Sequence, residues 1–334
     1  MNGHFVVSLD YEIHWGVFDK KSVNDYKENL ENVSKVIDRL LDMSSKYDVK
    51  LTFCTVGLLF AKDKNDLLHH LPQNKPTYSL EKLNPYQLLD SIGHDETDDS
   101  FHYANSKIKE IRDNGNHEIG THTFSHFNCH APGQTPEQFD EDLKASINIA
   151  KALGITIKSI VFPKNQINPD DAADKPYLQA CKKYGITSFR GKEKSFIYNI
   201  HSTKTYRNLW IFRALKPLDA YVNLTGTNTY DARAFADSGM LYNIPSSRFL
   251  RPFNRKLKYF EPLKLKRIKK AMTYAAKNNQ VYHLWWHPHN FGKYTEENFN
   301  TLETVFKTYK ALHETYGFQS ETMTGLTDKV KSAL

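Results

Sequence analysis

HEIGTHTFSH, residues 117–126, places two histidines directly behind a short predicted strand. Residues 117–121 are typical of a buried strand, and His122 and His126 follow it four positions apart. On one helical turn, two imidazoles with this spacing face the same way and can bind one metal ion. Reactive side chains of parallel α/β barrels gather at the carboxyl ends of the strands. The stretch therefore predicts a parallel sheet with a metal site at one edge.

Strands and helices alternate on both sides of this stretch. Seven apolar strand patterns are separated by amphipathic helix patterns, which predicts an α/β fold with a parallel sheet and helices outside. At 334 residues, a closed or nearly closed barrel is the form we expect. The predicted strands cover 4–9, 50–56, 117–121, 158–163, 186–190, 241–244 and 281–286, and the predicted helices cover about 24–47, 104–114, 136–153, 176–184, 261–278 and 295–316.

Two long stretches interrupt this alternation, at about 62–103 and 191–240. Both are aromatic and polar without a clear period, so we expect insertions on the rim of the barrel, where loops shape substrate sites. The sequence contains no internal repeat and no sign of a second domain. Residues 1–334 are therefore expected to form a single barrel domain.

Composition excludes several classes of protein. Hydrophobic residues make up 40% of the chain and charged residues 25%, which excludes a disordered chain. Three cysteines without a C-x-x-C pair argue against a disulfide scaffold and against a cysteine metal site. No apolar run is long enough to span a bilayer, and the first residues lack the basic region of a signal peptide. These features predict a cytoplasmic protein.

The net charge of +7 is concentrated in residues 248–270, which hold ten Lys or Arg residues and one acid, Glu261. A local excess of this kind does not indicate a nucleic-acid binder. We expect the apolar stripe Leu265, Ile268, Met272 and Ala275 to face the core, leaving Lys264, Lys266, Lys269 and Lys270 in solvent. The segment is either an ordinary barrel helix or a docking surface for an anionic membrane or a phosphorylated carrier, which would place the protein at the inner membrane surface.

Further reactive residues follow other predicted strands. Asp10 and Glu12 share one face of the first strand, so one carboxylate can bind a metal while the other acts as a base. His287 and His289 follow the last strand behind Trp285 and Trp286. An imidazole in this setting can donate a proton, and by chemistry alone the two histidines are equal candidates.

These motifs resemble the polysaccharide deacetylases, the NodB-type carbohydrate esterase family. HEIGTHTFSH is similar to the family's metal motif, SLDYE (8–12) to its first motif, VFPKNQ (161–166) to its third and LWWHPH (284–289) to its last. The resemblance implies a distorted (β/α)7 barrel and the metal-dependent removal of an acyl group from a sugar. It implies that Asp10 is the base, that His122 and His126 are metal ligands, and that His287 is the acid.

The chain departs from this pattern at two positions. The family's first motif commonly has adjacent aspartates, whereas Tyr11 stands second here, and Glu12 is therefore expected to be the third ligand. An arginine often orients the base in the third motif, a role that here falls to Lys164 or Arg190. Zinc suits two imidazoles and one carboxylate best, with Co, Ni, Mn or Fe as alternatives. A backbone N–H near Phe127 or Asn128 is expected to help hold the oxyanion.

The resulting hypothesis is a hydrolase of carbon–nitrogen bonds that acts on an N-acylated carbohydrate, in the synthesis of a surface polysaccharide or glycolipid. The alternatives are a linear-amide hydrolase acting on a non-sugar substrate and a non-catalytic sugar-binding protein of the same fold. The residues expected to contact substrate are Lys164, Arg190, Trp286 and His289.

Overall fold

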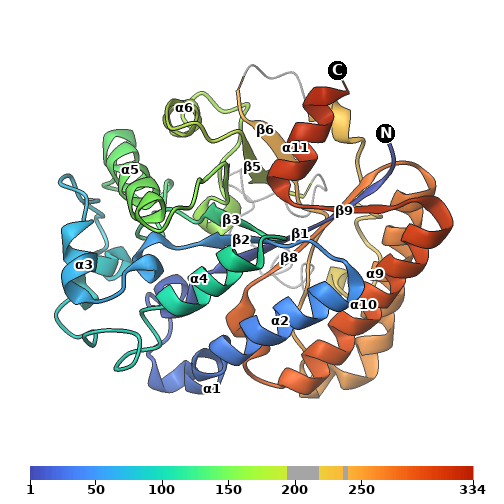
Figure 1. The fold of residues 1–334 in the computed structure, drawn as a ribbon, viewed down its shortest axis with the longest axis horizontal. Coiled ribbons are helices and arrows are strands. Elements are labelled where there is room, and N and C mark those ends of the chain that lie inside the picture. The colour runs from blue at the N-terminus through green and yellow to red at the C-terminus, as the bar shows by residue number, and fades with distance from the viewer. Residues whose placement is uncertain (194–217, 236–239, 334) are drawn as a thin grey trace.

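A twisted sheet of parallel strands forms the centre of the molecule, and helices surround it (Figure 1). The computed structural model describes residues 1–193, 218–235 and 240–333. Its strands are β1 (His4–Tyr11), β2 (Thr52–Thr55), β3 (Glu118–Thr121), β4 (Ser159–Ile160), β5 (Ser188–Gly191), β6 (Tyr242–Pro245), β7 (Arg248–Phe249), β8 (Val281–Trp286) and β9 (Gln319–Glu321). Its α-helices are α1 (Lys27–Glu31), α2 (Val33–Tyr47), α3 (Lys64–His69), α4 (Asn105–Asn114), α5 (Pro136–Ala152), α6 (Lys175–Lys183), α9 (Glu261–Lys277), α10 (Thr295–Tyr316) and α11 (Met323–Ser332).

The strands follow one another in the order β6-β5-β4-β3-β2-β1-β8-β7, and every pair is parallel. β6 and β7 are successive parts of one stretch of chain. Within it, the Ser246 N–H donates to Gly191 O at 3.0 Å, and the Ser247 N–H donates to His283 O at 2.8 Å. This stretch therefore leaves β5 and joins β8, which closes the ring of seven strand positions. The architecture agrees with the expected distorted (β/α)7 barrel.

Burial explains why these segments form the sheet. All eight residues of β1 are buried, as expected for a central parallel strand covered on both faces. β9, which the sequence patterns did not predict, pairs with the first residues of β1. The following helix α11, also not predicted, buries Met323, Leu326 and Val330 against residues such as Val6 and Val281. The amino end of the barrel is thereby closed, and the carboxyl ends of the strands are left to carry the site.

The predicted interruption at 62–103 contains α3 and two short 3-10 helices, Glu81–Leu83 and Pro85–Leu88. Of the second predicted interruption, 191–240, residues 194–217 and 236–239 lie outside the described residues. In the part of the chain that is described, no helix has the length and apolar character needed to cross a bilayer.

Helix α9 corrects one expectation about exposed charge. Lys264 is not in solvent but buried, where it forms an ion pair with Glu261 at 2.5 Å and donates to Arg251 O at 2.9 Å. The amphipathic pattern failed here because the 3-10 segment Arg255–Phe260 and the chain before it lie over this face of the helix. Lys266, Lys269 and Lys270 are exposed as expected.

Candidate metal and catalytic site

Glu12 lies at the centre of a buried cluster at the carboxyl end of β1. Its Oε2 atom is 3.3 Å from Nε2 of His122 and 3.3 Å from Nε2 of His126, which follow β3. The three side chains offer one carboxylate oxygen and two imidazole nitrogens close enough for a single metal ion. β1 and β3 both pair with β2, so adjacent strand ends bring these residues together.

The two histidines converge through a strained loop rather than through a helical turn, contrary to the sequence expectation. Thr123 and His126 have positive φ angles of 66° and 56°. The buried carboxylate of Asp142 on α5 supports this loop, since it accepts from the Phe124 N–H at 2.7 Å, from the Ser125 N–H at 3.2 Å and from the Ser125 hydroxyl. Burial raises the pKa of Asp142 to about 7, although these hydrogen bonds oppose the shift. Strain of this kind is typical of functional sites.

The backbone N–H groups that were expected to hold an oxyanion are already bonded. The Phe127 N–H donates to Thr123 Oγ1 at 2.7 Å, and the Asn128 N–H donates to the Tyr78 hydroxyl at 2.9 Å. Neither group is free to bind a reaction intermediate without breaking a bond that holds the loop. The contact of a backbone N–H in this loop with an oxyanion stays a prediction.

The hydrogen bonds of the cluster fit a cation. His122 Nδ1–H donates to Val161 O at 2.7 Å, as is usual for a metal-binding histidine, and in the neutral ring this places the Nε2 lone pair toward Glu12. Burial lowers the pKa of His126, although Glu12 opposes the shift. Neutral imidazole lone pairs directed at a carboxylate oxygen repel it unless a positive charge lies between them. The donor set thus fits a divalent metal.

Asp10, two residues before Glu12, is bound on both oxygens by Arg190 from β5. The guanidinium donates to Oδ1 and to Oδ2, each at 2.7 Å, and also to Ser8 and Asn165. Burial raises the pKa of Asp10, but Arg190 and the nearby imidazoles outweigh burial and hold it below its usual value. Arg190 itself is buried and stacks on Trp285 at 4.1 Å. Arg190, and not Lys164, therefore orients the Asp10 carboxylate, whereas the expected substrate contact of Arg190 stays a prediction.

His287 faces both carboxylates from the end of β8. Its Nε2 atom is 3.6 Å from Asp10 Oδ2 and 3.6 Å from Glu12 Oε1. Its Nδ1 accepts from the Asn290 amide at 3.2 Å, and Asn290 in turn accepts from the Tyr26 hydroxyl at 3.1 Å. With Nδ1 as an acceptor, the proton of the neutral ring lies on Nε2 and points into the site.

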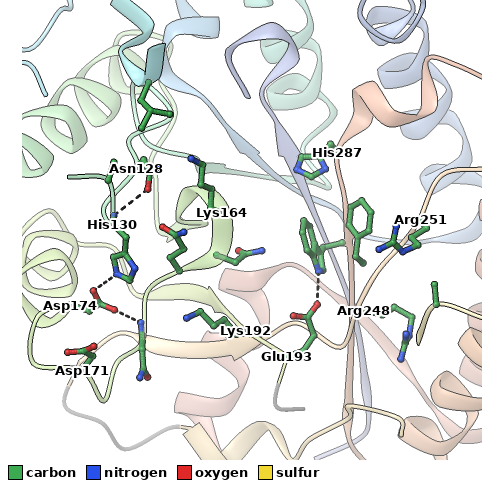
Figure 2. A pocket seen from close by; sticks show the side chains of 18 of the residues that line it. Asn128, His130, Lys164, Asp171, Asp174, Lys192, Glu193, Arg248, Arg251 and His287 are labelled. Carbon is green, nitrogen blue, oxygen red and sulfur yellow. Dashed lines mark hydrogen bonds and ion pairs between the residues drawn. The ribbon is translucent and has the colours of Figure 1, made fainter. Parts of the chain in front are cut away.

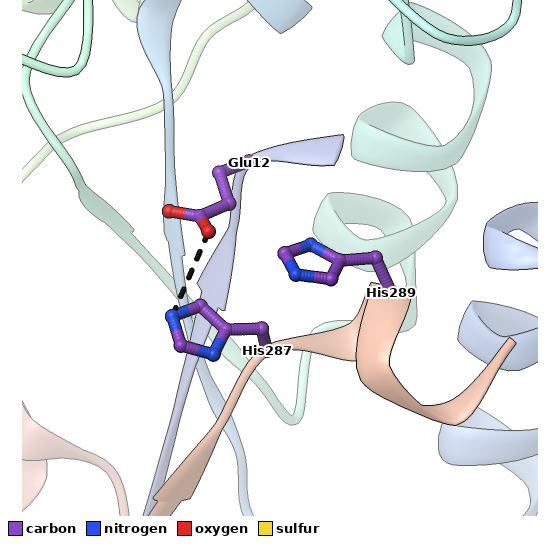
Figure 3. Close-up of side chains that lie close together, drawn as sticks. All are labelled: Glu12, His287 and His289. Carbon is purple, nitrogen blue, oxygen red and sulfur yellow. Dashed lines mark ion pairs between the residues drawn. The ribbon is translucent and has the colours of Figure 1, made fainter. Parts of the chain in front are cut away.

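His289 lies beside His287, with ring centroids 5.2 Å apart, and both point toward Glu12 (Figure 3). His289 is buried, and burial lowers its pKa to about 3, so the ring is neutral. Its Nδ1 has no hydrogen-bond partner among the described residues. Because His287 is the more exposed ring and contacts both carboxylates, the geometry favours His287 over His289 as the acid.

A cavity of about 920 Å³ opens beside His287 (Figure 2). Lys164 lines it, as expected for a substrate contact, and partial burial lowers the pKa of this lysine. Trp286, in contrast, is fully buried and stacks on Phe291 in the core. Trp285 lines the cavity instead. Because side chains alternate along a strand, Trp285 and not Trp286 shares the inward face with His287.

This placement predicts different consequences for the two tryptophans. Trp286→Ala is expected to lower the free energy of unfolding by about 3–5 kcal/mol, because it leaves a core cavity. Trp285→Ala should have a free energy of unfolding close to that of the wild type, but it should raise KM for a carbohydrate substrate. Denaturant titration and steady-state kinetics measure the two effects. A stable Trp286→Ala variant with a raised KM would restore Trp286 as the substrate contact.

Gly16 is a site residue that the sequence patterns missed. A Cβ atom at this position would lie 1.9 Å from the carboxyl carbon of Glu12, so only glycine leaves room for that side chain. Gly16→Ala is therefore expected to displace the carboxylate and to weaken metal binding by roughly 10–100-fold, the range seen when a ligand loses its support. Isothermal titration with zinc measures this. The control Gly115→Ala, at a helix end where no atom lies within 4 Å of an added Cβ, is strained by its φ of 74° and should lower stability, but it should leave zinc affinity unchanged.

Comparison with known proteins supports the resemblance to the polysaccharide deacetylases. A sequence model for the polysaccharide deacetylases matches residues 17–189, slightly more than half of the chain. No curated protein matches the sequence. A Mycobacterium smegmatis protein assigned as a polysaccharide deacetylase has the same fold at 12% identity, with a TM-score of 0.58 and coverage of 100% of this chain and 92% of its own. A protein of Pseudomonas aeruginosa PAO1 with the same assignment has a TM-score of 0.53 at 11% identity, covering 97% and 89%. Puue allantoinase gives 0.53 at 10% identity, covering 98% and 89%.

Proposed function

Since the chain belongs to the polysaccharide deacetylase family, we propose that it hydrolyses the N-acetyl or other N-acyl group of a carbohydrate with the help of one divalent metal ion. The position of Glu12 carries this proposal. One of its oxygens faces the imidazoles of His122 and His126, and the other faces His287, which also contacts Asp10. The residues that we propose as ligands, base and acid thus lie together at one edge of the barrel.

Glu12, His122 and His126 would hold the metal, which we propose to be zinc because two imidazoles and one carboxylate suit it. A divalent metal held there supplies Lewis acidity, which polarises an amide carbonyl and lowers the pKa of an attacking water molecule. Three protein ligands leave positions open for water and for substrate. Side chains of the protein carry out the proton transfers.

Asp10 acts as the base in this proposal. Its low pKa keeps it ionised at neutral pH, and the bidentate contact with Arg190 fixes the direction of its oxygens. It accepts a proton from the attacking water molecule, and Arg190 limits its movement during the transfer. Asp10 is not free to become the third metal ligand without losing this pair.

His287 acts as the acid. In its imidazolium form, the Nε2–H points toward the two carboxylates and donates a proton to the nitrogen atom that leaves as the C–N bond breaks, which returns the ring to the neutral form. Asn290 contacts Nδ1 of the ring, which leaves Nε2 as the nitrogen that faces the reaction. Tyr26 fixes the orientation of the Asn290 amide.

The cavity supports a carbohydrate substrate with a negatively charged group. Trp285 and Phe249 supply apolar ring surface, with ring centroids 4.7 Å apart, on which a sugar ring can stack. Lys164, Lys192 and Arg251 also line the cavity, and none of them forms an ion pair with a carboxylate of the described residues. Asp171, Asp174 and Glu193 line the same cavity, but the three cations next to the ring surface favour a phosphorylated carrier on the sugar, which supports a role in the synthesis of a surface polysaccharide or glycolipid.

A panel of amides tests the proposal. It contains neutral N-acetylated oligosaccharides, N-acetylated sugar nucleotides, lipid diphosphate-linked N-acetyl sugars and a linear ureide, each incubated with zinc-loaded protein. Release of acetate together with a free amino sugar supports the proposal. Cleavage of the ureide alone would make the protein a linear-amide hydrolase. Tight binding of sugars without any cleavage would make it a sugar-binding protein.

A further inference from the structure

An apolar patch lies on the surface next to the cavity. Eleven large apolar side chains are exposed in the described part of the chain, and six of them fall in two short segments, 218–224 and 259–263. Tyr259 is 81% exposed and Phe260 is 49% exposed. Scattered exposed apolar residues are ordinary, but a group of this size marks an interaction site. The apolar patch consists of Leu218, Val222, Leu224, Tyr259, Phe260 and Leu263.

The two segments adjoin each other. The rings of Tyr221 and Phe260 meet edge to face with centroids 6.1 Å apart. Arg267 of α9 donates to Val222 O at 3.1 Å and to Asp219 Oδ1 at 2.8 Å, which ties the first segment to the helix that begins within the second. The patch is therefore one surface built from two parts of the chain.

The charge around the patch has one sign. The two carboxylates of these segments, Asp219 and Glu261, are buried and bound by cations, Asp219 by Arg248 and Arg267 and Glu261 by Lys264. Their negative charge is therefore neutralised within the protein. The exposed charged side chains of the second segment and its flanks are all positive: Arg255, Lys256, Lys258, Lys266, Lys269 and Lys270.

We propose that the apolar patch and its flanking cations dock the protein on an anionic lipid bilayer. Tyrosine and phenylalanine side chains partition into the headgroup region, and lysine and arginine are attracted to anionic lipids. Charge argues against a second copy of this chain as the occupant, because two such surfaces would bring positive charges together. The same charge argues against a basic partner protein.

The position of the patch gives the docking a consequence for catalysis. Ala220, next to Tyr221, lines the cavity, and so does Arg251, whose carbonyl accepts from Lys264 of α9. Docking would therefore bring the cavity beside the lipid headgroups. This consequence rests on the proposed function and fits a lipid-linked sugar, whereas the docking itself requires no catalytic activity.

Vesicle co-sedimentation tests the proposal on the full chain. At low salt, the protein should sediment with vesicles of phosphatidylglycerol and phosphatidylcholine but not with phosphatidylcholine alone, and salt should weaken the binding. Tyr259→Ala/Phe260→Ala and Lys256→Gln/Lys258→Gln should each weaken it about tenfold or more. The matched control Tyr274→Ala/Tyr316→Ala removes exposed aromatic rings outside the patch and should bind like the wild type.

Three results would overturn the proposal. The first is equal, negligible sedimentation with neutral and anionic vesicles at low salt. The second is a change of oligomeric state in the Tyr259→Ala/Phe260→Ala variant by light scattering, which would make the patch a subunit interface. The third is binding to a phosphorylated acidic protein without binding to vesicles. Circular dichroism verifies that each variant is folded. Because sedimentation requires no turnover, its outcome is separate from the test of deacetylation.

Discussion

Asp10→Asn is expected to lower kcat by about 10²–10⁴-fold while the protein keeps its full metal content. The asparagine has nearly the same shape but cannot accept a proton from water at neutral pH. Asp10 lies against Arg190 rather than against His122 and His126, so its loss should not open the metal site. Elemental analysis and steady-state kinetics on the same sample measure both quantities.

Glu12→Gln is the matched control for this division of roles. It removes the carboxylate that faces both imidazoles and should empty the metal site. If Asp10→Asn loses the metal while Glu12→Gln retains it, the two carboxylates have the opposite roles. Arg190→Met should lower kcat as Asp10→Asn does, because the Asp10 carboxylate would then be free to rotate and its pKa would rise.

The double variant His122→Ala/His126→Ala is expected to lose the metal and all measurable hydrolysis. Of the three proposed ligands only Glu12 remains, and although His287 and His289 also lie near it, the proposal gives them no part in holding the metal. Since the loss of outer supporting groups already costs about 10–100-fold in affinity, the loss of two ligands should cost considerably more. Metal analysis after dialysis against chelator-free buffer measures the effect.

His130→Ala is the matched control for the double variant. His130 belongs to the same stretch of chain and lines the cavity, but it is bound to Asp174 at 2.7 Å and not to Glu12. It should keep one equivalent of metal. Full metal occupancy in His122→Ala/His126→Ala would contradict the assignment of the site.

The alternation of strand and helix patterns in the sequence was enough to predict at which edge of the sheet the candidate site lies. The alternation of strands and helices predicted a barrel, and a barrel collects the carboxyl ends of its strands at one edge. Asp10 and Glu12 lie at the carboxyl end of β1, and His122 and His126 follow β3, so their meeting did not depend on any side-chain detail. The match of β8 with the predicted 281–286 shows how well buried, bounded strands are recognised.

Contacts between distant side chains could not be predicted in this way. Arg190 was one of two candidates for orienting Asp10, and only the placement of β5 across the barrel selects it. Asp142 and Gly16 carry no local signal, because their roles depend on atoms that the fold brings beside them. For Trp285 a signal was available, since counting back two positions from His287 along the strand leads to it rather than to Trp286.

The most direct test of the account is a zinc titration of metal-free protein, with acetate release from an N-acetylated carbohydrate that the panel identifies as a substrate measured at each step. The account predicts that hydrolysis is absent without metal and rises in proportion to bound zinc up to one equivalent per chain. Hydrolysis at full rate in the metal-free protein, or one bound equivalent without hydrolysis of any N-acyl carbohydrate in the panel, would contradict it.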